Sequence, residues 1–139
     1  MSGTVHLVGI GGVGMSALAQ ALLDAGFTVT GADRALGGSG ARPAVLATLA
    51  RAGVRLFPDD GSGIGPDTAR VIVSTAVEET NRDLQCARAR GIPVVHRAAA
   101  LAELLAPRRL VAVAGTCGKS TVTAILGICL RRADSTPSS

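Results

Sequence analysis

The sequence predicts an α/β fold in which a parallel β-sheet carries helices on both faces. Short apolar stretches rich in β-branched residues alternate with longer stretches rich in Ala and Leu, as in repeated strand and helix units. A glycine-rich run follows the first apolar stretch, where a strand would turn into a helix. Of the 139 residues, 47% are hydrophobic and 17% charged, so we expect a globular domain with a substantial core.

Glycine and proline residues mark the boundaries of the predicted elements in the first half of the chain. Gly26 and Gly53 end the first two helices, and Pro43 opens the second of them. The loop at 36–42 is rich in Gly and Ser, and three glycines and two prolines at 58–66 predict a mobile loop at the ligand-binding edge. The predicted elements are a strand at 4–9, a helix at 15–25, a strand at 27–32, a helix at 43–52 and a strand at 54–57.

The second half continues the same alternation. Gly91 and Pro107 end its first two helices, and the polar tail at 133–139 is expected to be disordered. The predicted elements are a strand at 69–74, a helix at 81–90, a strand at 93–96, a helix at 98–105, a strand at 110–114 and a helix at 122–130.

Composition excludes several classes of protein. No apolar run approaches the roughly 20 residues that span a bilayer, and no signal peptide is evident, so we expect a cytoplasmic location. Cys86, Cys117 and Cys129 lack the spacing of a disulfide framework or a zinc site. The net charge of +4 comes with dispersed arginines and 1% aromatic residues, which suits anionic nucleotides better than single-stranded nucleic acid.

Gly9, Gly11 and Gly14 form a G-x-G-x-x-G run between the first strand and the first helix. Glycines there permit a tight turn, and N–H groups at the start of the helix then point at an anion. This pattern predicts a phosphate site. The alternative is a glycine-rich turn that only packs the helix on the sheet.

Polar side chains follow three later strands. Asp33 stands where a dinucleotide-binding fold places a carboxylate on a ribose, although it could be a solvated turn residue. Ser74 and Thr75 could bind a phosphate or a ribose, or cap a helix. His96 is typical of a structural hydrogen-bonding residue, whereas Arg97 is a candidate for binding phosphate.

A second phosphate loop follows the strand predicted at 110–114. Lys119 and Ser120 stand between a glycine turn and an apolar helix, and Lys119 is the only lysine of the chain. The loop is shortened, because Val113 occupies the place where the common motif has Gly. We expect backbone N–H groups and Lys119 to hold phosphates, and the Ser120 hydroxyl to ligate Mg²⁺.

Together the two loops resemble the N-terminal part of the Mur ligases, ATP-dependent enzymes of peptidoglycan precursor synthesis. The segments that carry the resemblance are HLVGIGGVGMS (6–16), GAD (31–33), STA (74–76), GIPVVHRA (91–98) and VAVAGTCGKST (111–121). The resemblance covers nearly the whole chain.

The resemblance implies a Rossmann-like domain at 1–107 that binds UDP-N-acetylmuramate, the start of a central ATPase domain at 108–132, and the disordered tail. It assigns the UDP-sugar to Gly9, Gly11, Gly12, Val13, Gly14, Met15, Ser16, Asp33, Ser74, Thr75, His96 and Arg97. It assigns ATP to Gly115, Thr116, Cys117, Gly118, Lys119, Ser120 and Thr121, with Lys119 catalytic and Mg²⁺ at Ser120. ATP would phosphorylate the muramoyl carboxylate, and the amine of L-alanine would attack the acyl phosphate.

Three departures limit these expectations. Cys117 replaces the usual His or Asn, and Pro58-Asp59 follows the third strand instead of a Gly-His type pair. The chain also ends one helix after the second loop, so we expect it to bind the UDP-sugar without ligating.

Other functions stay open at this point. An NAD-binding domain of an oxidoreductase or sensor explains the first loop and Asp33, but leaves the second loop unexplained. A second alternative is a non-catalytic module, either a stand-alone UDP-sugar-binding protein or a truncated gene product. An independent P-loop NTPase would need an acidic Mg²⁺ partner at a neighbouring strand end, where only Asp33 is available.

Overall fold

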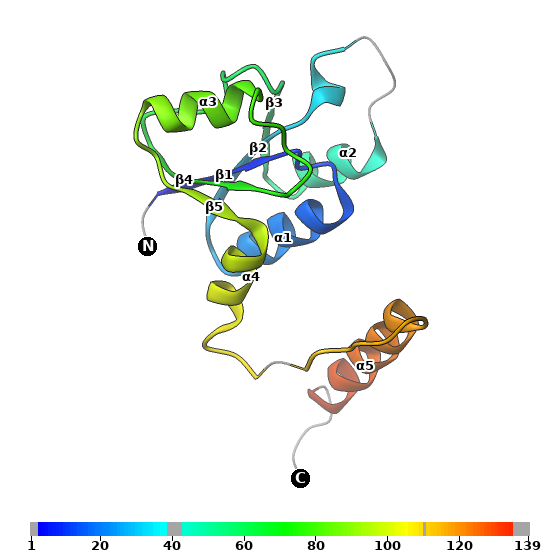
Figure 1. The fold of residues 1–139 in the computed structure, drawn as a ribbon. Coiled ribbons are helices and arrows are strands. Elements are labelled where there is room, and N and C mark those ends of the chain that lie inside the picture. The colour runs from blue at the N-terminus through cyan, green and yellow to red at the C-terminus, as the bar shows by residue number, and fades with distance from the viewer. Residues whose placement is uncertain (1–2, 39–42, 110, 135–139) are drawn as a thin grey trace. The chain divides into compact units, whose positions relative to one another are not determined.

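The computed structural model describes residues 3–38, 43–109 and 111–134. The chain divides into two units, Met1–Ala106 and Pro107–Ser139. The first unit contains a five-stranded sheet in which all neighbouring strands are parallel (Figure 1). Across the sheet the strands are β3 (Arg55–Phe57), β2 (Thr28–Ala32), β1 (Thr4–Val8), β4 (Thr68–Val73) and β5 (Val94–His96).

Helices cover both faces, which confirms the predicted fold class. The helices on one face are α1 (Val13–Asp24), α2 (Ala44–Arg51) and α4 (Arg97–Leu105), which share a core with Val5, Leu7 and Ile72. On the other face, α3 (Arg82–Ala89) packs with Val8 and Val71. A short 3₁₀ turn, η1 (Arg34–Leu36), follows β2. Because both faces are covered, β1 is buried along its whole length, including its polar residues Thr4 and His6.

The order of the strands determines where a ligand can bind. The chain moves outward on one side of β1 to β2 and β3, and on the other side to β4 and β5. In open parallel sheets, ligands bind in the crevice beyond the carboxyl ends of the strands where the direction of winding changes. Here that crevice lies beyond β1 and β4, beside the glycine run.

One glycine within a strand has a packing reason. A Cβ atom added to Gly31 of β2 would lie 2.4 Å from Cδ1 of Ile10, which is fully buried. Only glycine therefore lets the segment after β1 seat its isoleucine against β2.

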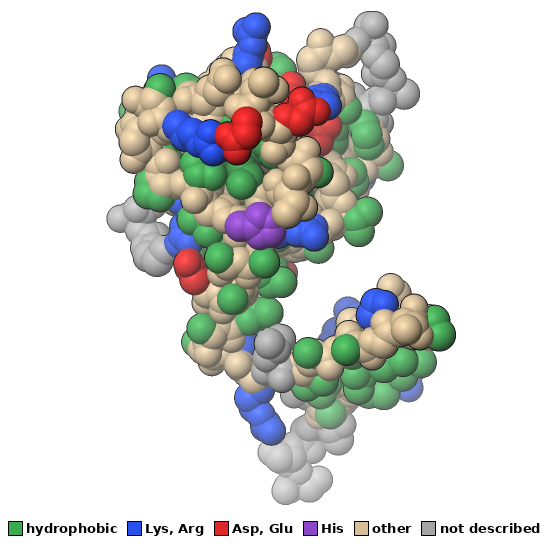
Figure 2. Space-filling view, in the orientation of Figure 1, with side chains coloured by type: hydrophobic (Ala, Val, Ile, Leu, Met, Phe, Trp, Pro, Cys, Tyr) green, Lys and Arg blue, Asp and Glu red, His purple; other side chains and the backbone are tan. Residues whose placement is uncertain are grey.

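The second unit departs from the predicted secondary structure. Described residues 111–114 pair with no described strand, so the strand expected at 110–114 is absent there, because a strand requires a hydrogen-bonded neighbour. Helix α5 (Lys119–Asp134) begins before the expected residue 122 and continues into the expected tail. Figure 2 shows hydrophobic side chains along the surface of this helix. The large exposed ones are Val122, Ile125, Leu126, Ile128 and Leu130.

The loop at 58–66, expected to be mobile, packs on the α3 face. Ile64 is 3% exposed and belongs to the same cluster as Val8 and Ala87. The parts of the predicted loop and tail at 39–42 and 135–139, and Leu110, lie outside the described residues. None of the helices in the described ranges is long and apolar enough to cross a membrane.

Candidate functional site

The glycine run is fastened to the end of β2. Gly9 has a φ of 70°, in the left-handed region that favours glycine. The N–H groups of Gly9 and Ile10 both donate to the carbonyl of Ala32, at 2.8 and 3.0 Å, and Gly12 N–H donates to the carbonyl of Gly9. These bonds attach the turn to the carboxyl end of β2.

Asp33 completes this attachment. Its Oδ2 accepts a hydrogen bond from Gly11 N–H at 2.8 Å, and its Oδ1 accepts one from Ala35 N–H at 3.0 Å. A Cβ on Gly11 would lie 2.7 Å from Oδ2. Gly11 is thus required by a contact with Asp33, and Asp33 joins the glycine run to η1.

Two N–H groups of the run remain available for an anion. Those of Met15 and Ser16 donate to the carbonyl of Gly12. Within the part of the chain that the structure describes, Val13 and Gly14 N–H have no acceptor. They belong to the first turn of α1, where unpaired donors and the helix dipole favour negative charge.

Arg97 adds a positive charge at the same place. A Cβ on Gly14 would lie 1.9 Å from Arg97 Nη1, so the guanidinium rests against the backbone of Gly14. Gly14 and Arg97 also line one end of an apolar groove of about 460 Å³ between α1 and α4. Together, the two N–H groups and the guanidinium can bind a phosphate or diphosphate.

The remaining predicted side chains around the run have structural contacts. Met15 is buried in the core, and the Ser16 hydroxyl donates to the carbonyl of Val13 at 3.0 Å. His96 caps α4, because its Nδ1 accepts a hydrogen bond from Ala98 N–H at 3.2 Å. These contacts leave the backbone of the run, rather than Met15 or Ser16 side chains, to face an anion.

A polar groove of about 220 Å³ lies at the carboxyl ends of β1, β2 and β4. The structure brings three of the predicted residues together in it, whereas exposed Thr75 is not among the residues that line it. The groove is lined by Val8, Gly9, Asp33, Arg34, Asp59, Ser74, Ala76, Val77 and Asn81.

Arg34 connects the three segments that surround this groove. Its Nε lies 3.5 Å from Oδ2 of Asp59, which follows β3, and its Nη2 lies 3.7 Å from Oε1 of Glu78, which follows β4. Asn81 Nδ2 donates to the same Asp59 oxygen at 3.5 Å. Asn81 also caps α3, where its Oδ1 accepts from Leu84 N–H at 3.1 Å.

Two buried ionisable residues lie against the loop at 58–66. Asp83 is fully buried and its Oδ1 accepts from Gly61 N–H at 3.0 Å; burial, with repulsion from Asp59 and Asp60, raises the pKa of its carboxyl to about 6. His6 is fully buried with Nδ1 2.8 Å from Thr30 Oγ1, and burial lowers the pKa of its imidazole to about 4. Asp83 Oδ2 and His6 Nε2 have no partner within the described residues.

The second loop forms a turn ahead of α5. Lys119 Nζ donates to the carbonyl of Gly115 at 2.6 Å, so the ammonium lies over the turn that a phosphate would enter. Gly118 has a φ of 77°, and residues 115–121 are exposed. The described residues contain no group of three His, Cys, Asp or Glu side chains able to hold a metal ion.

Comparison with known proteins identifies the family. The model of the "Mur ligase family, catalytic domain" matches residues 4–109, which is most of the chain. The chain belongs to the Mur ligase family.

Individual Mur ligases agree with this. The chain is 42% identical over 133 residues to UDP-N-acetylmuramate–L-alanine ligase of Laribacter hongkongensis, and 45% identical over 135 residues to the enzyme of that name from Halorhodospira halophila. These matches cover 96% of the chain but 27% and 26% of the two enzymes. The chain thus spans about a quarter of the length of these relatives.

Solved structures of Mur ligases have the same fold. UDP-N-acetylmuramate-alanine ligase from Thermotoga maritima matches 97% of the chain and 30% of its own length, with a TM-score of 0.84 and 30% identity. A murein peptide ligase from Psychrobacter arcticus matches 95% of the chain and 27% of its own length, with a TM-score of 0.83 and 29% identity. These similarities do not favour an NAD-dependent oxidoreductase.

Sequence reasoning missed three polar residues that line the groove of this Mur ligase chain: Arg34, Asp59 and Asn81. Each stands next to a predicted element boundary, after β2, after β3 or before α3. This position could have identified them as candidates for the site, since the loops that follow parallel strands meet at one edge of the sheet. It could not reveal that Arg34 reaches across to Asp59 and Glu78.

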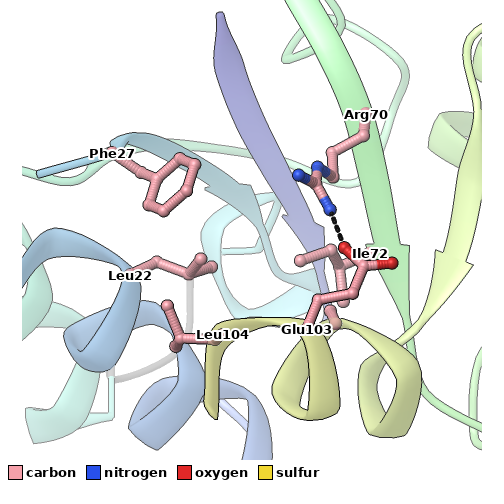
Figure 3. Close-up of a pocket in the computed structure, with 7 residues that line it drawn as sticks. Leu22, Phe27, Arg70, Ile72, Glu103 and Leu104 are labelled. Atoms are coloured by element: carbon pink, nitrogen blue, oxygen red, sulfur yellow. Dashed lines mark hydrogen bonds and ion pairs between the residues drawn. The ribbon is translucent and has the colours of Figure 1, made fainter. Parts of the chain in front are cut away.

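A separate hollow of about 110 Å³ lies between α1, α4 and β4, where Arg70 Nη1 donates to Glu103 Oε2 at 2.7 Å (Figure 3). Leu22, Phe27 and Leu104 supply its apolar wall. Phe27 precedes β2 and Leu22 is near the end of α1, so the hollow lies toward the amino ends of the strands. None of the predicted site residues lines it.

Proposed function

We propose that the Met1–Ala106 unit binds the UDP-sugar of an ATP-dependent ligase that joins L-alanine to UDP-N-acetylmuramate. The observation that carries this proposal is the pair of free N–H groups at Val13 and Gly14 with Arg97 beside them. A diphosphate is an anion that such a helix N-terminus and a guanidinium accommodate together. The names of the relatives supply the identity of the sugar and of the amino acid.

The polar groove would then hold the uridine. Asp33 and Ser74 line it, and Asp33 keeps acceptor capacity for a ribose hydroxyl beyond the two backbone bonds that it already accepts. Gly9, Gly11 and Gly12 shape the turn beside it. Thr75 and His96 stay candidates for the same ligand. The cytoplasmic location expected from the sequence stays a prediction.

The loop at 115–121 would hold the phosphates of ATP. The Lys119 ammonium and the N–H groups at the start of α5 fit an anion, and the Ser120 hydroxyl offers one oxygen to Mg²⁺. Mg²⁺ bound there would supply positive charge to the phosphates. Lys119 would stabilise the phosphoryl group as it passes to the muramoyl carboxylate, before the amine of L-alanine attacks the resulting acyl phosphate.

Calorimetry of the 139-residue polypeptide tests the binding step. We expect saturable heat with UDP-N-acetylmuramate and none with NAD. The Arg97→Met variant should bind the UDP-sugar more weakly, whereas Arg51→Met, which removes an exposed charge from α2, should not. Heat with NAD alone would overturn the proposal.

We expect binding without turnover from this polypeptide, because it spans about a quarter of the length of its relatives. Incubation with UDP-N-acetylmuramate, ATP and L-alanine, followed by assay of released phosphate, checks this. Phosphate release that depends on L-alanine would contradict it.

A further inference from the structure

The polar groove offers no aromatic side chain to a nucleobase. The sequence contains two phenylalanines, Phe27 and Phe57, and no Trp or Tyr. Of its two histidines, His6 is fully buried, and neither His6 nor His96 is among the residues that line the groove. Neither phenylalanine lines the groove: Phe27 lines the hollow of Figure 3, and the Phe57 ring lies near Gly63. A base in this groove must therefore find another planar surface.

Among the residues that the structure describes, Arg34 is the only cation that lines the groove, and its guanidinium is planar. Asp59 and Glu78 lie 3.5 and 3.7 Å from its nitrogens and come from two different loops. A carboxylate that pairs with a guanidinium at its N–H edge leaves the flat faces of the guanidinium open. The Arg34 side chain is 70% exposed, so a ligand can reach one of these faces.

The anionic walls of the groove favour this use of Arg34. Asp33 and Asp59 both line it, and Asp33 is already bonded to backbone N–H groups of Gly11 and Ala35. A neutral base stacked on a guanidinium retains the ion pairs of Arg34 with Asp59 and Glu78. A phosphate bound to Arg34 would instead compete with these two carboxylates and face their repulsion.

We propose that the Arg34 guanidinium is the stacking surface for the nucleobase, with Asp59 and Glu78 as positioning residues that hold its plane. This inference rests on the proposed function and identifies the base subsite of the same site. Arginine planes stack on bases, whereas a lysine ammonium retains the charge without a flat face. Arg34 therefore contributes to the selection of a nucleotide over other diphosphates.

The test measures the affinity of the chain and of Arg34→Lys for three probes by calorimetry. The probes are UDP, 5,6-dihydro-UDP, whose base has lost its aromatic face, and inorganic diphosphate. We expect Arg34→Lys to weaken UDP binding about 5-fold or more, in line with stacking of about 1–3 kcal/mol per base. Diphosphate should bind both proteins alike, and dihydro-UDP should bind both with similarly reduced affinity.

Two further variants sharpen this test. Arg51→Lys, on an exposed turn of α2, is the matched control and should leave all three affinities unchanged. Glu78→Gln keeps Arg34 but removes one of the two carboxylates that position its guanidinium. We expect this variant to weaken UDP binding about 2-fold or more. Unchanged thermal unfolding midpoints would show that each variant folds.

Each outcome distinguishes the inference from the function on which it rests. Equal weakening of UDP and diphosphate by Arg34→Lys would assign Arg34 to phosphate and overturn the stacking role. Unchanged UDP affinity in Arg34→Lys would overturn it as well, while leaving UDP-sugar binding in place. Failure of the unaltered chain to bind UDP or UDP-N-acetylmuramate would overturn the proposed function and this inference together.

Discussion

At the scale of single residues, the anion site depends on which N–H groups the turn itself uses. Gly9, Ile10 and Gly12 donate to backbone carbonyls, and Gly11 donates to Asp33. The glycine run therefore owes part of its composition to internal hydrogen bonds and to close contacts. The N–H groups that we propose for an anion are those of the first turn of α1. Arg97 and Asp33 act at the two ends of this arrangement.

Asp33→Ala should destabilise the fold. It leaves the N–H groups of Gly11 and Ala35 without their acceptor, and an unsatisfied, partly buried donor costs about 1–3 kcal/mol. We expect the free energy of unfolding in urea to fall by an amount of that order, with weaker UDP binding. Asp33→Asn keeps one carbonyl acceptor, so its free energy of unfolding should lie between those of the parent and of Asp33→Ala. If Asp33→Ala were as stable as the parent, the hydrogen bonds of Asp33 to Gly11 and Ala35 would not stabilise the fold.

Gly14→Ala should separate binding from stability. The added methyl would occupy the position of Arg97 Nη1, so the guanidinium must move away from the two free N–H groups. Alanine is favoured over glycine in a helix by about 1 kcal/mol at most, so the thermal midpoint should not fall. Calorimetry should show weaker diphosphate binding.

A double-mutant cycle identifies the cause of that loss. If displacement of Arg97 is responsible, Arg97→Met should weaken binding much less in the Gly14→Ala background than in the parent chain. Additive losses would mean that the methyl group blocks the ligand directly.

At the scale of elements, α3 links the groove to the fold. Asn81 caps this helix and lines the groove, while Asp83 in its first turn accepts from Gly61. The loop at 58–66 is thereby attached to α3, and Asp59 at its start faces Arg34.

Asn81→Ala should cost about 1 kcal/mol of unfolding free energy, the usual value of a lost N-cap. Asn81→Ser restores an acceptor for Leu84 N–H without the amide that reaches Asp59, so it should recover most of the stability. Urea unfolding measures both variants. If both variants were destabilised equally, the lost stability would come from the contact of Asn81 with Asp59 and not from the cap of α3.

Sequence patterns predicted the elements whose causes are local. Gly26 and Gly53 follow α1 and α2, and the apolar run of β1 is typical of a strand covered on both sides. The prediction of a strand at 110–114 was wrong for residues 111–114. The composition of a segment does not reveal whether a partner strand lies beside it. The glycines of the loop at 58–66 predicted mobility, and its own sequence gave no sign that Ile64 is buried, because that burial depends on α3.

The candidate site was predictable in its backbone but not in its side-chain network. The glycine run, Asp33, Ser74 and Arg97 occupy positions that βα units make recognisable. The contacts of Arg34 with Asp59 and Glu78 join residues far apart in the sequence, and no local pattern encodes them. The assignments of individual residues to ligands stay predictions.

At the scale of the whole molecule, the two predicted phosphate loops belong to different units. The glycine run lies in Met1–Ala106, which has its own core, and the loop at 115–121 lies in Pro107–Ser139. The described part of the second unit presents exposed apolar residues along α5. The assignment of that unit to a central ATPase domain stays a prediction.

The stability of the first unit should depend on pH through two buried groups with opposite effects. The pKa of His6 is about 4 in the folded chain and 6.5 as the ordinary value, so the unfolded chain binds more protons between these values. This contribution to stability is complete above pH 6.5 and is lost as the pH falls toward 4. Asp83 has a pKa of about 6 against an ordinary 3.8, so its contribution is complete below 3.8 and is lost as the pH rises through 6.

Because the two windows overlap, their effects oppose each other between about pH 4 and 6, and single variants should reveal them. Asp83→Asn leaves the His6 effect unopposed, so its unfolding free energy should fall more steeply than that of the parent as the pH drops from 6.5 to 4. His6→Gln leaves the Asp83 effect, so lowering the pH across the same interval should stabilise this variant relative to the parent. Urea unfolding at pH 4.5, 5.5 and 7 measures both differences. Parallel pH profiles for the parent and both variants would mean that neither group has its pKa shifted by burial in the folded chain.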